Sequence, residues 1–241
     1  SIAIIIMLRD SNDTENREPG TRKSIGGNPF AGFALFIRSP LLLGIGLFIF
    51  LYTAISTFVY FELKNMMSGV DKALRVQIWG MMDLVVNILA IGTAMFATSR
   101  LTTRFGLTVT LMLVPIVIVG GLLVVAMAPM LWVVVALQIV RRAGNYSITK
   151  PGREMLFTVV DRETRFKAKG VVDIIVYRGG DAITAWVFTG LTQGLGAGLG
   201  VVAMIGAGIA AVWAMTVRYL GRAYAHYDKA KPSSEKITES V

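Results

Sequence analysis

The chain has 241 residues and a composition unlike that of soluble domains. Hydrophobic residues make up 54% and charged residues 16% of it, whereas an ordinary soluble domain carries about 25% charged residues. There is no cysteine, which excludes a disulfide framework and a thiolate metal site. The net charge of +9 would suit a nucleic-acid partner, but the basic residues gather between apolar segments. That pattern is typical of a membrane protein, and we expect no nucleic-acid partner.

Six apolar segments are each long enough to cross a membrane as a helix. They span residues 40–63, 76–99, 106–128, 130–152, 167–194 and 199–220. A hydrocarbon core of about 30 Å needs roughly 20 helical residues, and a helix satisfies its own backbone groups in lipid. We therefore predict an all-α fold. Because the connections are short, the six transmembrane helices should form one polytopic bundle over residues 39–222, of the type found in half of a major facilitator protein.

The two ends of the chain differ from the predicted bundle. Residues 1–8 are apolar and lack the basic leader and small-residue cleavage site of a signal peptide, so we interpret them as the end of a preceding membrane helix. Residues 9–38 have the composition of a cytoplasmic linker, and residues 223–241 are predicted to form a disordered cytoplasmic tail. The sequence therefore suggests the C-terminal half of a twelve-helix protein. The N-terminal six-helix half would be a partner in the same or a separate chain.

Basic residues are distributed unequally between the two sides of the predicted bundle. The connections and helix ends of one side carry twelve Lys and Arg residues, and those of the other side carry three, namely Lys64, Lys72 and Arg75. Short loops rich in Lys and Arg stay in the cytoplasm. We therefore expect a multi-pass protein of a bacterial inner membrane with both ends in the cytoplasm.

Arg141 and Arg142 lie in the middle of the fourth apolar segment. The run 130–140 is too short to cross alone, so the helix must continue through the arginines toward Pro151. At about 1.5 Å per residue, Arg141 lies roughly 16 Å deep, where a charge costs at least about 2.5–3.5 kcal/mol. Guanidinium groups bind phosphate or carboxylate through paired hydrogen bonds. The pair therefore predicts an anion site facing the bundle interior.

Other polar residues share faces with these arginines or lie at similar depth in the fifth segment. Arg178 lies roughly 17 Å deep, and Asp181 follows at i+3, close enough for an ion pair. The expected substrate-binding residues are Arg141, Arg142, Asn145, Tyr146, Lys150, Arg153, Tyr177, Arg178 and Asp181. The expected charge-pairing or gating residues are Asp83, Asp173, Arg100 and Arg104. The alternative is that the arginines only pair with acidic residues and lock the bundle.

Residues 142–181 (RAGNYSITKPGREMLFTVVDRETRFKAKGVVDIIVYRGGD) combine charged residues in a distinctive order. Its core consists of Pro151, Arg153-Glu154-Met155, Asp161, Lys167, Lys169, Asp173 and Arg178-Gly179-Gly180. This order resembles the ATP/ADP exchange (nucleotide transporter) family of the major facilitator superfamily. The basic turn at residues 99–106 also resembles the loop of that superfamily, with Thr103 in place of its acidic residue. The resemblance implies strict exchange of nucleotides, although Asp181 stands where the ATP/ADP translocases carry a basic residue.

The sequence therefore predicts a secondary transporter, an antiporter of an anionic solute such as a nucleotide or another phosphorylated metabolite. A non-transporting subunit docked onto a larger membrane complex is one alternative, and it would have fully paired charges and no open cavity. A proton-coupled symporter with Asp83 or Asp181 as the titrating group is another. The sequence shows no Ser/His/Asp set, catalytic thiol or metal-ligand cluster, so we expect neither an enzyme nor a cofactor.

Overall fold

The computed structural model describes residues 33, 36–37, 39–95, 99–160 and 162–230, and every regular element in them is helical. The α-helices are α3 (Pro40–Met66), α4 (Lys72–Thr93), α5 (Ser99–Met127), α6 (Leu131–Gly144), α7 (Lys150–Leu156), α8 (Arg162–Val171), α9 (Tyr177–Thr189) and α10 (Leu199–Ala230). Three π-helical turns, η2 (Asn145–Thr149), η3 (Val172–Val176) and η4 (Gly190–Gly194), join some of them. The predicted all-α class is confirmed.

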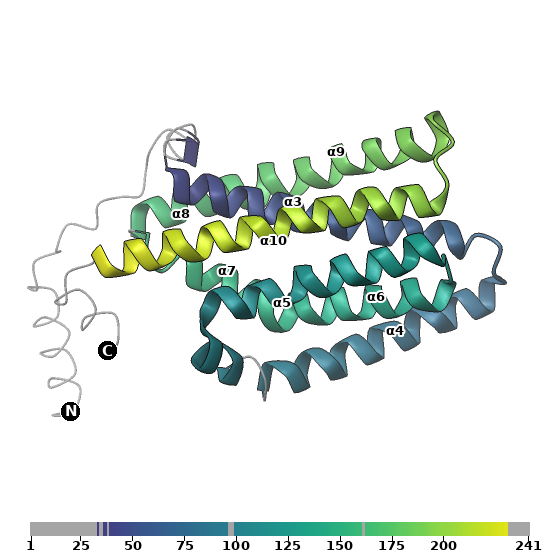
Figure 1. Cartoon of the computed structure of the whole chain (residues 1–241), viewed down its shortest axis with the longest axis horizontal. Helices are drawn as coiled ribbons and strands as arrows, with labels where there is room; N and C mark the ends of the chain where they lie inside the picture. Colours follow the sequence, from purple (N-terminus) through teal and green to yellow (C-terminus); the bar gives the residue numbers. More distant parts are fainter. Residues whose placement is uncertain (1–32, 34–35, 38, 96–98, 161, 231–241) are drawn as a thin grey trace, which may run out of the picture.

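The elements form six rods that run alternately in opposite directions (Figure 1). Helices α3, α4 and α10 are each one rod, and α5 forms another with a kink at Gly106. Helix α6 continues through η2 into α7, and α8 continues through η3, α9 and η4. Helices over Pro40–Met66, Lys72–Thr93, Thr102–Met127 and Leu199–Ala225 are long and apolar enough to cross a membrane. This supports the assignment to the membrane class. That the two interrupted rods also cross the bilayer, as in a major facilitator half, stays a prediction.

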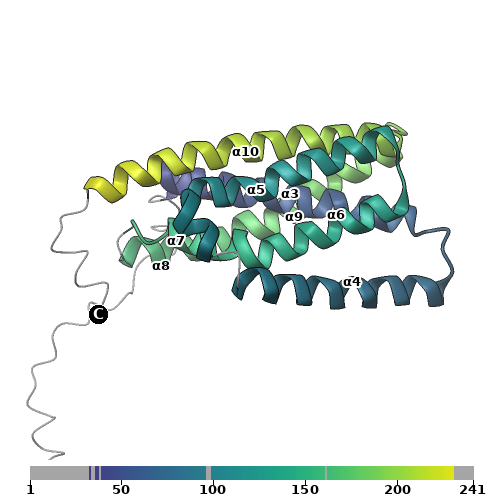
Figure 2. The ribbon, with the colours of Figure 1, turned by 60° about the horizontal axis from the view of Figure 1, so that its bottom comes forward.

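Helix α3 is the central rod, and it packs against α10, α9 and α6. Its aromatic residues Phe48 and Tyr52 each lie with their ring centroids 5.7 Å from that of Trp213 on α10, which is fully buried. Helix α4 lies at one edge of the bundle (Figure 2) and buries only Ile78, Met82 and Val86. The centre of the fold is therefore built on α3, while α4 presents most of its apolar surface outward.

Glycines let α10 approach its neighbours closely. A Cβ atom on Gly221 would lie 2.0 Å from Thr108 Oγ1 and 2.7 Å from Thr108 Cβ on α5. At the other end of the helix, a Cβ atom on Gly200 would lie 3.0 Å from the carbonyl oxygen of Ala126. Small residues at such crossings are the usual means by which membrane helices gain packing contacts. Helices α5 and α10 thus pack tightly against each other along their length.

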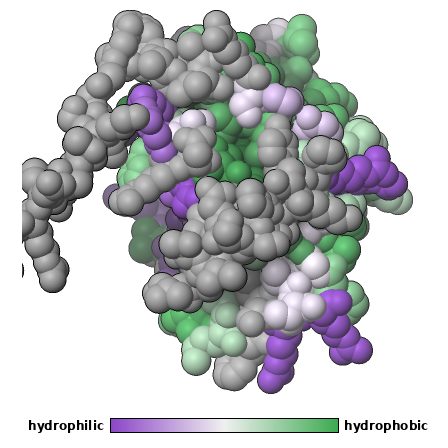
Figure 3. Space-filling view, turned by 90° about the vertical axis from the view of Figure 1, so that its left-hand side faces the viewer, coloured by the Kyte–Doolittle hydropathy of each residue, from purple (hydrophilic) through white to green (hydrophobic). Residues whose placement is uncertain are grey.

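The most basic connections meet at one end of the bundle. Figure 1 places α7, α8, the start of α5 and the end of α10 together at its left. Seen from that end, hydrophilic residues stand around the rim of the described surface (Figure 3). The end of α10 differs from the prediction, because residues 223–230 continue the helix instead of forming a disordered tail. Residues 231–241, the predicted segment 1–8 and most of the predicted linker 9–38 lie outside the described residues.

Replacing Gly221 by alanine should destabilise the protein, because the new methyl group overlaps the Thr108 side chain up to its Cβ atom and cannot be relieved by rotation alone. Overpacking of this kind costs about 1–3 kcal/mol. Thermal unfolding of the purified protein in detergent should show a lower Tm for Gly221→Ala. The control is Gly208→Ala on the same helix, where nothing lies within 4 Å of the added atom. Equal Tm values for the two variants would contradict the α5–α10 contact.

Candidate functional site

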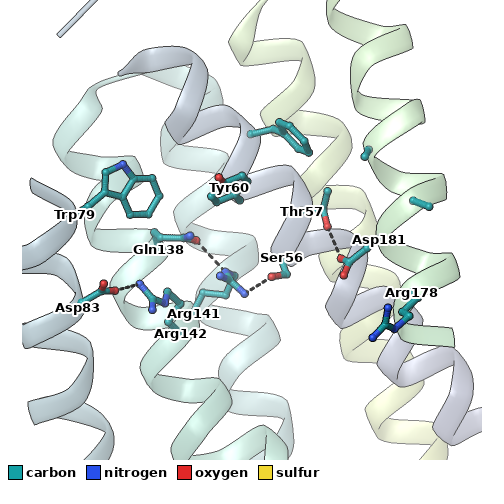
Figure 4. Close-up of a pocket in the computed structure, with 13 residues that line it drawn as sticks. Ser56, Thr57, Tyr60, Trp79, Asp83, Gln138, Arg141, Arg142, Arg178 and Asp181 are labelled. Atoms are coloured by element: carbon teal, nitrogen blue, oxygen red, sulfur yellow. Dashed lines mark hydrogen bonds and ion pairs between the residues drawn. The ribbon is translucent and has the colours of Figure 1, made fainter. Parts of the chain in front are cut away.

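An open cleft of about 830 Å³ lies between α3, α4, α6 and α9 (Figure 4). Three arginines and two aspartates line it, together with polar and aromatic residues of α3 and α4. The charged residues are Arg141, Arg142, Arg178, Asp83 and Asp181. The cleft therefore brings together five residues that the sequence predicted from three separate segments, and positive charges outnumber negative ones.

Arg141 is buried at the base of this cleft, with 4% of its surface exposed. Its Nε donates to Gln138 Oε1 at 3.0 Å, and its Nη1 donates to Ser56 Oγ at 2.7 Å and to Tyr52 Oη at 3.5 Å. All three partners are neutral, and no acidic side chain forms an ion pair with Arg141 in the described part of the chain. The guanidinium is thus hydrogen-bonded and oriented, but its charge is not neutralised.

Arg142 has the acidic partner that Arg141 lacks. Its Nη1 donates to Asp83 Oδ1 and forms an ion pair that joins α6 to α4. More than half of the Asp83 side chain is exposed, so this pair lies in the open part of the cleft. An exposed ion pair contributes little free energy, and an incoming anion could displace the carboxylate.

Arg178 and Asp181 face the cleft from α9, on the side opposite Asp83 (Figure 4). The expected ion pair between them is not formed, because Asp181 Oδ1 instead accepts a hydrogen bond from Thr57 Oγ1 of α3 at 2.9 Å. Among the described residues, Arg178 has no ion-pair partner. Spacing of i and i+3 permits contact along a helix, but here a neighbouring helix offers Asp181 a better-placed donor. Arg178 is left with a free guanidinium facing the cleft.

A smaller cavity of about 200 Å³ adjoins the cleft and shares Ser56 and Asp181 with it. It is lined by Tyr52, Thr53, Ser56, Asn145, Lys150, Tyr177 and Asp181. Asn145 and Thr53 are buried, and their Oδ1 and Oγ1 atoms have no hydrogen-bond partner within the described structure. Buried polar atoms without partners are uncommon in native proteins and call for an explanation.

Two π-helical turns position the residues around this cavity. The Lys150 N–H donates to the Asn145 carbonyl, and the Tyr177 N–H donates to the Val172 carbonyl, each five residues back. Pro151 gives a local reason for the first turn, because proline lacks an N–H and crowds the carbonyl four residues earlier. Such turns are frequent at functional sites. They place Asn145 at the start of one turn and Tyr177 directly after another.

Arg153 lies outside both cavities, in a network at the basic end of the bundle. Its Nη2 donates to Glu154 Oε1 at 3.0 Å, its Nη1 lies 3.8 Å from Asp173 Oδ1, and Lys169 Nζ donates to the other oxygen of Glu154. The guanidinium also lies 5.9 Å from the ring centroid of Tyr177. The network of Arg153, Glu154, Lys169 and Asp173 therefore ties α7 to α8 and η3, and these four residues do not line the cleft.

The remaining predicted residues also lie outside the cleft. The Lys150 ammonium lies 4.6 Å from the ring centroid of Tyr146, whose side chain is half exposed and lines neither cavity. Arg100 and Arg104 are exposed at the start of α5, and the structure describes no ion pair for either. The Arg104 guanidinium lies 5.7 Å from the Phe105 ring. Their gating role stays a prediction.

The sequence analysis missed the contribution of α3 to the site, although it predicted Asp83 of α4. Tyr52, Ser56 and Tyr60 recur at i, i+4 and i+8, and Thr53 and Thr57 form a parallel stripe. These are polar positions in an otherwise apolar helix, so this spacing could have revealed the face that turns toward the arginines. Gln138 lies three residues before Arg141 and is likewise a polar residue on the same face of an apolar helix.

No family model, curated protein or solved structure matches the chain. Over the residues that it describes, the structure itself shows a helical protein with four candidate membrane spans and a cleft lined by three arginines.

The network around Glu154 predicts a loss of stability in acid. Burial raises the pKa of Glu154, but hydrogen bonds from Lys169 and Arg153 outweigh this effect and hold the pKa below the ordinary value of a glutamate. A carboxylate with a lowered pKa contributes stability that is present above its unfolded pKa and is lost as the pH falls through its folded pKa. The fall in Tm between pH 7 and pH 3 should therefore be smaller for Glu154→Gln than for the wild type. An equal fall would show that the network is not formed.

Proposed function

We propose that the protein is a secondary transporter that exchanges an anionic solute across a membrane. The observation that carries the proposal is Arg141, a buried guanidinium whose partners are all neutral, at the base of an open cleft. Ionisable residues at membrane depth usually mark a substrate or ion pathway. A bound anion would supply the negative charge that the described surroundings of Arg141 do not.

The other charges of the cleft support an anion as the ligand. Arg178 faces the same cleft without an ion-pair partner among the described residues, and Arg142 is held by the half-exposed Asp83. Guanidinium groups bind phosphate through two parallel hydrogen bonds, so three of them around one cleft suit a phosphoryl group. A nucleotide or another phosphorylated metabolite is therefore our proposed substrate, in agreement with the resemblance of residues 142–181 to the ATP/ADP exchange family.

Exchange follows from the charge balance of the empty cleft. Without substrate, the charges of Arg141 and Arg178 are not balanced while the bundle reorients. Moving unbalanced charges through a medium of low dielectric constant costs free energy. With an anion bound, the site is more nearly neutral, so reorientation of the bundle costs less free energy. The Asp83–Arg142 pair would open on loading and re-form on release. Return of the protein then requires a second anion.

The position of the cleft also implies a covering partner. The cleft lies between α4 and α9, which pack on α6 and α3 respectively, and charged side chains facing lipid are costly. We propose that a second six-helix half, in the same or a separate chain, closes this side in a bacterial inner membrane. The rival role, a docked subunit without transport, expects paired charges and no open cavity, and both Arg141 and Arg178 argue against it.

Arg178→Ala should weaken binding of labelled ADP and inorganic phosphate roughly ten- to a hundredfold, since a hydrogen bond to a charged group contributes about 1.5–3 kcal/mol. Arg178 is exposed to the cleft and makes no described ion pair, so its removal should leave folding intact. Scintillation proximity measurements on the protein purified from its native membrane would test this. Arg218→Ala is the control, because Arg218 is exposed on α10 and lines no described cavity. Unchanged affinity in Arg178→Ala would refute the site.

Proteoliposomes preloaded with a counter-substrate should take up labelled solute at a rate at least about tenfold above that of empty vesicles, because the unloaded cleft reorients slowly. The test uses ATP, ADP and inorganic phosphate in turn on either side. Full efflux of the solute without any counter-substrate would exclude exchange. Uptake driven by a pH gradient alone would instead identify a proton-coupled symporter.

A further inference from the structure

The small cavity beside the cleft has a composition of its own. Its lining contains hydroxyl groups from Tyr52, Thr53, Ser56 and Tyr177 and the side-chain amide of Asn145. Hydroxyl and amide groups can each donate and accept hydrogen bonds. The charged residues of the small cavity are Lys150 and Asp181, whereas three arginines and two aspartates line the cleft beside its own hydroxyl and amide groups. The cleft therefore favours an anionic group, and the small cavity favours a group that forms several neutral hydrogen bonds.

The unpartnered atoms show where a ligand would gain hydrogen bonds. Asn145 Oδ1 and Thr53 Oγ1 are buried and have no partner within the described structure. Asn145 itself is 6% exposed and Thr53 is 2% exposed. Leaving such atoms unsatisfied costs about 1–3 kcal/mol each. A ligand that offered them polar hydrogens or lone pairs would recover this free energy.

The size of the cavity limits what it can hold. A volume of about 200 Å³ exceeds the roughly 150 Å³ of an engineered cavity that binds benzene. One five- or six-membered ring therefore fits. The ligand is not a metal cation, because Lys150 lines the cavity and the Arg141 guanidinium donates to both Tyr52 and Ser56 of its wall.

The relation of the two spaces points to a single ligand that occupies both. Ser56 and Asp181 line the cleft and the cavity alike, and Ser56 accepts a hydrogen bond from Arg141 at 2.7 Å (Figure 4). We infer that the small cavity is a subsite for a hydroxylated ring, held by Asn145 and Thr53, whose phosphate ester is bound by the arginines of the cleft. This inference rests on the proposed function, and it narrows the substrate to a phosphorylated sugar or a compound that contains one.

The subsite predicts that a ring adds affinity beyond that of the phosphate. The protein purified from its native membrane, with its co-purifying chains, would be titrated by calorimetry with methyl phosphate and with ribose 5-phosphate. We expect ribose 5-phosphate to bind at least about tenfold more tightly. Thr53→Val and Asn145→Leu keep the size of each side chain, and each should reduce this advantage about three- to tenfold, the effect of one hydrogen bond. Affinity for methyl phosphate should stay unchanged.

The controls separate the subsite from the proposed function and from general damage. Thr110→Val makes the same substitution at a buried threonine of α5 whose hydroxyl donates to the Gly106 carbonyl and which lines neither cavity, and it should change neither affinity. Equal affinity of the wild type for the two esters, or an equal loss in Thr110→Val, would overturn the subsite and leave the proposed function standing. If neither ester binds and Arg178→Ala is without effect on phosphate, the proposed function fails and the subsite fails with it.

Discussion

The burial of one guanidinium group shapes this structure more than any other interaction. Arg141 lies in the middle of an apolar rod, and its surroundings provide Gln138, Ser56 and Tyr52 as hydrogen-bond acceptors. Hydrogen bonds compensate for the lost water but leave the charge in a medium of low dielectric constant. A buried arginine of this kind is stable only if helix packing holds its hydrogen-bond acceptors in place.

The packing of the other rods provides that fixed frame. The acceptors on α3 are held by the aromatic contacts of Phe48 and Tyr52 with Trp213, and α10 is locked onto α5 by glycine contacts. The two rods that bring further charges to the cleft, α4 and α9, lie on its outer sides. The buried arginine therefore lies in the tightly packed part of the bundle. Asp83 and Arg178, which has no ion-pair partner among the described residues, come from the rods at the edges of the cleft.

The sequence predicted the helical rods because they depend on local patterns, whereas the depth of the arginines in a membrane stays a prediction. An apolar run and the rise of a helix are enough to show that the helix continues past Arg142 to Pro151. The same patterns do not tell which neighbour a side chain meets. Asp181 therefore bonds to Thr57 and not to Arg178, and Arg153 belongs to the network at the end of the bundle. The polar stripe of α3 was missed because short hydroxyl side chains alone are weak signals in an apolar helix.

The charge pattern of the cleft also bears on the proposed selectivity for anions. A neutral solute would leave Arg141 and Arg178 unbalanced, and a cation would add to the repulsion, so only an anion lowers the electrostatic free energy of the site. Two aspartates keep this attraction from becoming too strong, because Asp83 must be displaced from Arg142 before a third guanidinium can bind. If the protein transports an anion as proposed, it must also release it, and a site that is partly paired when empty would give up its ligand more readily than three unpaired arginines would.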